Sequence, residues 1–186
     1  MVDSGSPAPP LRPLLAYVFS HRPSGGADVA AYEGSLRRFH AELASASLSG
    51  FIRSATFAVG IGYSDWYLLE NTAAMDTLNA AAVSGSRAPA HDSAARMASD
   101  GVGKLLSLAS GRPSMDEGFE VRFGKPAGMP YRDFYARLES WTEAPEISLW
   151  RRMMVLGPPP EFCLITPSKV ELPAEMHPEV LDRTPI

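Results

Sequence analysis

His40 is the residue in this sequence best placed for acid–base chemistry. It lies between Leu36 and Leu43 at helical spacing, so it shares the apolar face of a helix predicted from Asp28 to about Ala46. An imidazole on that face points toward the core and any cavity beneath it, where it can act as a general base or bind a ligand. The alternative is a structural histidine whose partners lie in the core.

Basic side chains at predicted strand ends form a second candidate group. His21 and Arg22 follow the apolar strand Leu14–Ser20, and Lys125 follows the strand Phe119–Phe123. Cations at equivalent strand ends can bind a carboxylate or a phenolate substrate. Solvated loop residues are the alternative.

Arg53 lies within a predicted apolar strand, Phe51–Val59, and shares one side of it with Phe51, Ala55 and Phe57. An arginine that faces a buried interior needs an acidic partner or an anionic ligand, because an unpaired buried charge is costly. The sequence offers Glu70 on the next strand as that partner, and Arg53 is a candidate anion holder.

Tyr32 and Trp66 belong to a set of aromatic residues near strand ends and helix starts. Aromatic side chains with a polar atom often line small-molecule pockets, although core packing is the alternative. Trp66 and Tyr67 are neighbours in a predicted strand and point to opposite faces, so at most one of them faces a barrel interior. Tyr32 and Trp66 complete the candidate substrate-binding set.

Composition excludes several classes of protein. The 186 residues carry a net charge of −4 and are 45% hydrophobic and 20% charged, which fits a globular fold and argues against a nucleic-acid partner. Cys163, the single cysteine, excludes a disulfide within the chain, and four scattered histidines lack metal-ligand spacing, so neither metal nor cofactor is predicted. No stretch is long and apolar enough to cross a membrane, and a cytoplasmic location is expected.

Similar patterns occur twice along the chain, in residues 14–70 and again in residues 119–166. Each has an apolar strand, a basic residue before proline, a helix opening near a tyrosine, and a hairpin. We predict a disordered lead-in over 1–12, a first ferredoxin-like unit over 13–110, and a second, truncated unit over 111–186 in which no fourth strand is evident.

Two β-α-β-β units whose strands are apolar on both faces resemble the dimeric α/β-barrel superfamily, in which two ferredoxin-like units pack into one barrel. The resemblance implies an α+β fold with both units in one chain, a bacterial source and, as one option, a homodimer. The superfamily includes haem enzymes. Their strand asparagine and helix histidine have no counterpart here, and the late histidine of the chlorite-dismutase pattern is represented only by His177 in a proline-rich tail.

The resemblance implies a barrel that binds a small apolar or aromatic ligand. If the protein is an enzyme, a cofactor-independent monooxygenase or an isomerase fits, with His40 as the base and Arg53 as the anion holder. The alternative is a non-catalytic structural or stress-related oligomeric protein whose barrel is filled with side chains. A cavity lined by His40, Arg53 and aromatic residues would favour the first interpretation.

Overall fold

The computed structural model describes residues 14–186, so the predicted lead-in over 1–12 lies outside the described residues. The chain alternates strands with helices in both halves. In chain order the elements are β1 (Leu15–Pro23), α1 (Val29–Ala44), β2 (Phe51–Val59), β3 (Gly62–Leu69), α2 (Ala73–Ala82), α3 (Arg87–Met97), β4 (Ala98–Ser110), β5 (Gly118–Phe123), α4 (Tyr131–Thr142), β6 (Ser148–Arg152), β7 (Phe162–Thr166), the 3-10 turn η1 (Ala174–Met176) and β8 (Glu179–Pro185).

The strands close into one antiparallel barrel in the order β1-β3-β2-β8-β5-β7-β6-β4. The N-terminal half contributes β4-β1-β3-β2 and the C-terminal half contributes β8-β5-β7-β6, so both halves place their fourth, first, third and second strands side by side. They join where β2 pairs with β8 and β4 pairs with β6. The fold is α+β, as predicted, while a repeat in the sequence and the unit boundary near residue 110 remain predictions.

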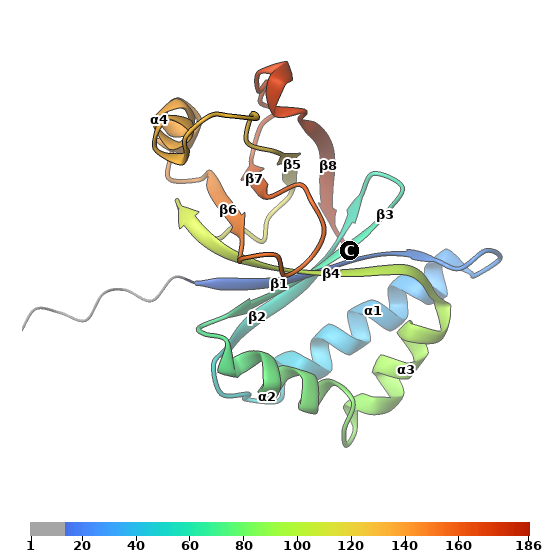
Figure 1. Ribbon diagram of the computed structural model, residues 1–186. Coiled ribbons are helices and arrows are strands. Elements are labelled where there is room, and N and C mark those ends of the chain that lie inside the picture. The colour runs from blue at the N-terminus through green and yellow to red at the C-terminus, as the bar shows by residue number, and fades with distance from the viewer. Residues whose placement is uncertain (1–13) are drawn as a thin grey trace, which may run out of the picture.

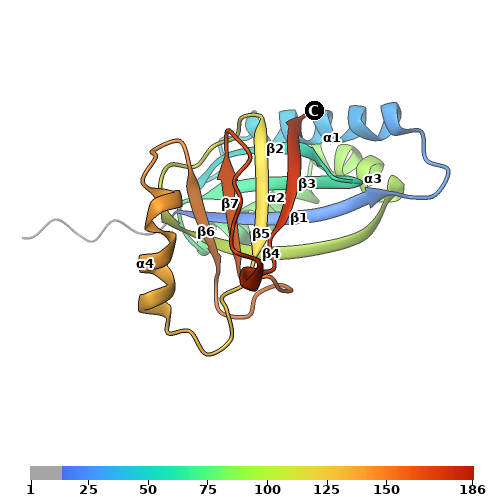
Figure 2. The same cartoon turned by 90° about the horizontal axis from the view of Figure 1, so that it is seen from above.

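The helices cover the outside of the barrel unequally (Figure 1). Helices α1, α2 and α3 lie against the N-terminal strands, whereas α4 lies on the C-terminal side, as the view from above also shows (Figure 2). Helix α1 begins where the Asp28 carboxylate accepts a hydrogen bond from the Ala31 amide at 3.0 Å. Its buried face carries Leu36, Phe39 and Leu43, in line with the predicted spacing.

The middle of the barrel is filled by large side chains. The rings of Trp66 and Trp150 meet edge to face with centroids 5.4 Å apart. Arg183 is fully buried above the Phe57 ring, and its guanidinium donates to the carbonyl of Asp116 at 2.6 Å. Burial lowers the pKa of Arg183 to about 10. This arginine therefore holds the segment between β4 and β5 over one end of the barrel.

The C-terminal tail differs from its prediction. Residues 179–185 form β8, which pairs with both β2 and β5 and closes the barrel. The tail shows no alternating apolar pattern and contains prolines at both ends of this strand, which concealed it in the sequence. The second half is therefore shorter because η1 stands where the first half has α2 and α3, and not because a strand is missing.

A β-bulge corrects the predicted face of the second strand. The register of β2 against β3 shifts between Phe51 and Arg53, so Phe51 packs in the cluster on the helix side. Ala55 and Phe57 pack inside the barrel. Phe51 thus does not share the face of Ala55 and Phe57, as the strict alternation had predicted.

Candidate functional site

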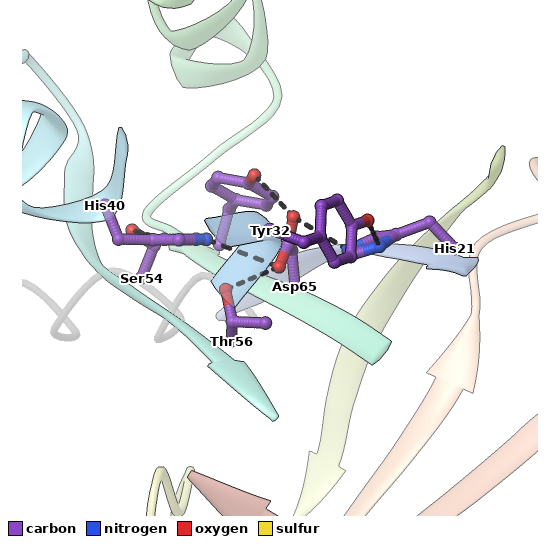
Figure 3. A network of polar contacts seen from close by, with 7 residues as sticks. His21, Tyr32, His40, Ser54, Thr56 and Asp65 are labelled. Atoms are coloured by element: carbon purple, nitrogen blue, oxygen red, sulfur yellow. Dashed lines mark hydrogen bonds and ion pairs between the residues drawn. The ribbon is translucent and has the colours of Figure 1, made fainter. Parts of the chain in front are cut away.

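Asp65, on β3, is the centre of a buried polar network between the sheet and α1 (Figure 3). Thr56 Oγ1 donates to Asp65 Oδ1 at 2.6 Å, and the Tyr67 hydroxyl donates to Oδ2 at 3.3 Å. His21 Nε2 lies 3.2 Å from Oδ2, and His40 Nε2 lies 3.4 Å from Oδ1. Each carboxylate oxygen therefore has one hydroxyl and one imidazole in contact.

Two arms extend from this carboxylate through its histidines (Figure 3). On one side His21 Nδ1 is hydrogen-bonded to the Tyr32 hydroxyl, and on the other His40 Nδ1 lies 2.6 Å from Ser54 Oγ. Because each Nε2 faces Asp65, a neutral imidazole carries its proton there and accepts through Nδ1. Tyr32 and Ser54 are therefore the hydroxyl donors at the ends of the two arms.

Burial by itself raises the pKa of Asp65, but the contacts from His21 and His40 outweigh it, and the pKa lies well below its ordinary value. Asp65 is thus ionised across the physiological pH range. Burial, with the charge of Asp65 as a second cause, raises the pKa of Tyr32 and Tyr67 well above the ordinary phenol value. Both phenols therefore stay protonated around one carboxylate.

A cavity of about 610 Å³ lies between the sheet and the helices, and Tyr32, His21 and Asp65 line it. Aromatic side chains form much of its wall on the sheet side. These residues are Tyr17, Phe19 and Tyr67, and Phe39 of α1 adds a ring from the helix side. On the helix side the wall includes the small side chains Ala82, Ala94 and Ala95, which leave space unfilled. The volume is in the range of small-molecule sites.

The cavity reaches solvent between α2 and α3. Asp76 and Asn79 of α2 and Ala95 of α3 all line it, and all three are exposed. His91, half-buried on α3, lines the same opening and contacts Asp92 at 3.2 Å. A ligand that enters here passes from a polar rim to an aromatic wall, with the Tyr32 hydroxyl and Asp65 on the sheet side.

The structure brings together three of the residues singled out in the sequence. His21 and Tyr32 line the cavity, and His40 joins them through Asp65 without lining the cavity itself. His40 does point from α1 toward the sheet, as its spacing predicts, and it is 8% exposed.

The remaining predicted site residues lie elsewhere. Arg22 is exposed, and Trp66 is inside the barrel. Lys125 donates to the carbonyl of Met129 at 2.6 Å and lines an opening at the end of the barrel. Arg53 is exposed, and its guanidinium is 3.5 Å from the carbonyl of Pro113 rather than paired with the predicted Glu70. His21 and Lys125 therefore line different cavities.

Ser54, Thr56, Asp65 and Tyr67 are the residues of the network that the sequence analysis did not select. A signal was present, because Asp65 stands in a strand of otherwise apolar and aromatic residues with both faces covered. A carboxylate in such a strand needs donors, and His21 and His40 were the available ones. The sequence does not show which strands are neighbours, so the pairing could not be read from it.

No protein-family model and no curated protein matches this sequence. Solved structures do match in fold. "Putative Chlorite dismutase TA0507" superposes with a TM-score of 0.57 at 12% identity, covering 94% of this chain and 95% of the other. A "putative monooxygenase from Lactobacillus acidophilus NCFM" superposes with a TM-score of 0.53 at 10% identity, covering 92% of this chain and 77% of the other. At these identities the likeness shows a common fold.

The residues of the first cavity do not fit a haem. The cavity is lined by the carboxylates of Asp65 and Asp76 and by no lysine or arginine among the described residues, and carboxylates repel haem propionates. His177 is exposed at the end of η1, away from this cavity. Among residues 14–186, no group of three or more metal-ligating side chains is gathered, and no helix has the length and apolar character to span a membrane.

Proposed function

We propose that the protein binds a small, largely apolar or aromatic molecule between the sheet and helices α1 to α3 and removes a proton from it. The observation that carries this proposal is the Tyr32–His21–Asp65 arm, whose three members all line the cavity. The fold likeness to a monooxygenase and a chlorite dismutase, as those proteins are named, is compatible with small-molecule chemistry and with the dimeric α/β-barrel superfamily.

The arm moves a proton in one concerted step. The acidic O–H or C–H of the ligand gives its proton to the Tyr32 oxygen while the phenol proton passes to His21 Nδ1. Asp65 stabilises the resulting imidazolium through Nε2, as a buried carboxylate does beside a catalytic histidine. Because its pKa is raised, Tyr32 holds the proton that it must pass on until a ligand arrives. His40 and Thr56 are positioning residues that fix Asp65.

Two reaction classes follow from proton removal. In an isomerase the proton returns to another carbon of the ligand, and no co-reactant is needed. In a cofactor-independent monooxygenase the carbanion reacts with dioxygen, one oxygen atom enters the product as a carbonyl and the other leaves as water. Both keep the catalytic base at Tyr32 and His21, which moves the predicted role of base away from His40.

Deuterium exchange tests the proposal without knowledge of the product. The protein is incubated in D₂O with the aromatic carbon acids phenylacetone and anthrone, and NMR follows loss of the acidic C–H signal. Wild type is expected to accelerate exchange, and Tyr32→Phe to lower the rate on the order of 100-fold. Tyr63→Phe is the matched control, because Tyr63 stacks on His21 with centroids 5.9 Å apart but does not line the cavity. Equal rates for the two variants would contradict the proposal.

A non-catalytic oligomeric protein is the second candidate, and the packed middle of the barrel favours it. Trp66, Trp150 and Arg183 are each buried to 1% exposure or less, as a purely structural barrel requires. This candidate predicts no accelerated exchange and no saturable binding of either probe. It also predicts that the protein sediments as a stable assembly larger than a monomer. Accelerated exchange that depends on Tyr32 would rule it out.

A further inference from the structure

A second cavity lies inside the barrel toward one end, beyond the packed tryptophans of its middle and on the other face of the same strands. Its volume is about 270 Å³, and Val18 and Ser20 of β1 line it, whereas Tyr17, Phe19 and His21 of β1 line the first cavity. Successive residues of a strand point to opposite faces, so the two cavities are separated by the sheet. They have no lining residue in common.

Two residues that line this second cavity each carry a buried polar atom with no hydrogen-bond partner among the described residues. The atoms are Nε1 of Trp66, a side chain that is 1% exposed, and Oε2 of Glu120, which is 2% exposed. The other carboxylate oxygen, Glu120 Oε1, accepts from Arg122 Nε at 2.7 Å. Leaving a donor and an acceptor unpaired in the interior is costly. The pair therefore fits a ligand that offers both an acceptor and a donor.

Lys104 offers a partner for a negatively charged group of a ligand here. Lys104 lines the cavity and uses one ammonium hydrogen on the carbonyl of Pro160 at 3.0 Å, which leaves two hydrogens for another acceptor. An outer opening of about 570 Å³ adjoins the cavity at Arg122 and Glu179, which line both. Lys125, Arg152 and Glu161 also line that opening, so its three cations exceed its two carboxylates by one charge, which favours the entry of an anion.

We propose that the barrel cavity binds a small organic carboxylate that also carries a hydroxyl or amino group. The carboxylate accepts from Trp66 Nε1 and the Lys104 ammonium, and the hydroxyl or amino group donates to Glu120 Oε2. The apolar lining from Val18, Leu106 and the proline loop accommodates the carbon skeleton. This site is independent of the proton-removing site, because the sheet separates them.

Indole N–H resonances in ¹H–¹⁵N NMR spectra report on this site directly. The chain has three tryptophans, and Trp150 Nε1 already donates to Ser148 Oγ at 3.0 Å, so its signal is an internal control. The probes are L-malate and p-hydroxybenzoate, and their matched partners are succinate and benzoate, which lack the hydroxyl group. Trp66→Phe assigns the resonance by its loss while keeping an aromatic ring in the core.

We expect the hydroxy acids to shift the Trp66 resonance saturably and to bind at least about tenfold more tightly than their matched partners. Glu120→Gln is expected to weaken their binding by a similar factor, and Tyr32→Phe, in the other cavity, to leave it unchanged. An unmoved Trp66 resonance with all four acids would overturn the proposal and indicate a site filled by water alone. Equal affinities within each matched pair would also overturn it, and that comparison needs no variant to fold.

Discussion

The two halves of the barrel carry opposite chemistry on the same three elements, the first strand, the first helix and the third strand. The residues are His21, Tyr32 and Asp65 in the N-terminal half and Phe123, Phe134 and Phe162 in the C-terminal half. The phenylalanine rings pack with centroids 4.8 to 6.3 Å apart. An apolar set stabilises a layer of helix on sheet, so the polar set gives up such packing at the place where we propose a proton-removing site.

The helices explain why only one of these layers is hollow. In the C-terminal half, α4 lies directly on β5 and β7, and Phe134 and Leu138 fill the contact. In the N-terminal half, α2 and α3 extend the layer beyond α1 and present alanines to the cavity. A cavity of the size of a small molecule thus arises where the extra helices cover the sheet without filling the space beneath them.

Removing Phe134 should have the largest effect on stability. The ring is fully buried between Phe123 and Phe162, so Phe134→Ala leaves a cavity that the surrounding rings cannot close. We expect a loss of about 3–5 kcal/mol in the free energy of unfolding, measured by urea denaturation. Tyr131→Ala, on the same helix but 42% exposed, is the matched control and should lose much less. Comparable losses in both variants would refute the contrast between a packed and a hollow layer.

Asp65→Asn should have the next largest effect, and it should depend on pH. The pKa of Asp65 is lowered on folding, so the ionised carboxylate stabilises the native state above its ordinary value of 3.8. We expect the variant to be less stable than wild type by roughly 2 kcal/mol at neutral pH. The amide keeps the shape of the side chain but presents only one acceptor to the surrounding donors.

The sign of the pH dependence follows from linkage. Below pH 3.8 the unfolded wild-type chain protonates Asp65, whereas the folded chain does so only at the lower folded pKa. The stabilisation that the ionised carboxylate gives the native state is therefore lost as the pH falls through this range. The variant has no carboxyl group to titrate at this position, so the two free energies should converge in acid. Urea midpoints measured from neutral to strongly acidic pH give the difference directly. Parallel curves would mean that Asp65 is not the ionised centre of the network.

His40→Ala separates positioning from catalysis. His40 contacts Asp65 and Ser54 but does not line the cavity, so we expect a loss of about 1–3 kcal/mol in stability, seen as a lower Tm. Deuterium exchange at a temperature where the variant is folded should retain a larger fraction of the wild-type rate than Tyr32→Phe does. Abolished exchange in a stable variant would return the role of base to His40.

Part of this site, His21, Tyr32 and His40, could be predicted from the sequence. The rest could not, and the reasons are physical. Helical spacing placed His40 against the sheet, because side-chain direction on a helix is local. Asp65 was overlooked because its partners come from β1 and α1, and strand neighbours are not local information. We expected a cavity inside the barrel. The larger cavity lies instead on the helix-covered face of the sheet, and the sequence could not predict it because its walls depend on how α2 and α3 pack.

Arg53 gives the smallest predicted effect, because its position at the end of a strand leaves it exposed. The strict alternation of β2 predicted Arg53 as a buried anion holder. The register shift moves Phe51 to the other face, whereas Arg53 stays on the side of Ala55 but lies at the end of the barrel, where it is exposed and its guanidinium is 3.5 Å from the carbonyl of Pro113. Arg53→Ala should therefore change stability by no more than about 0.5 kcal/mol and leave deuterium exchange unchanged. Arg183, the buried arginine at that end, is the contrast, because its removal leaves two carbonyls and a ring without their partner. If Arg53→Ala abolished exchange or binding of an aromatic carbon acid, the anion-holding role would stand and the barrel end, rather than the helix-covered face, would be the site of chemistry.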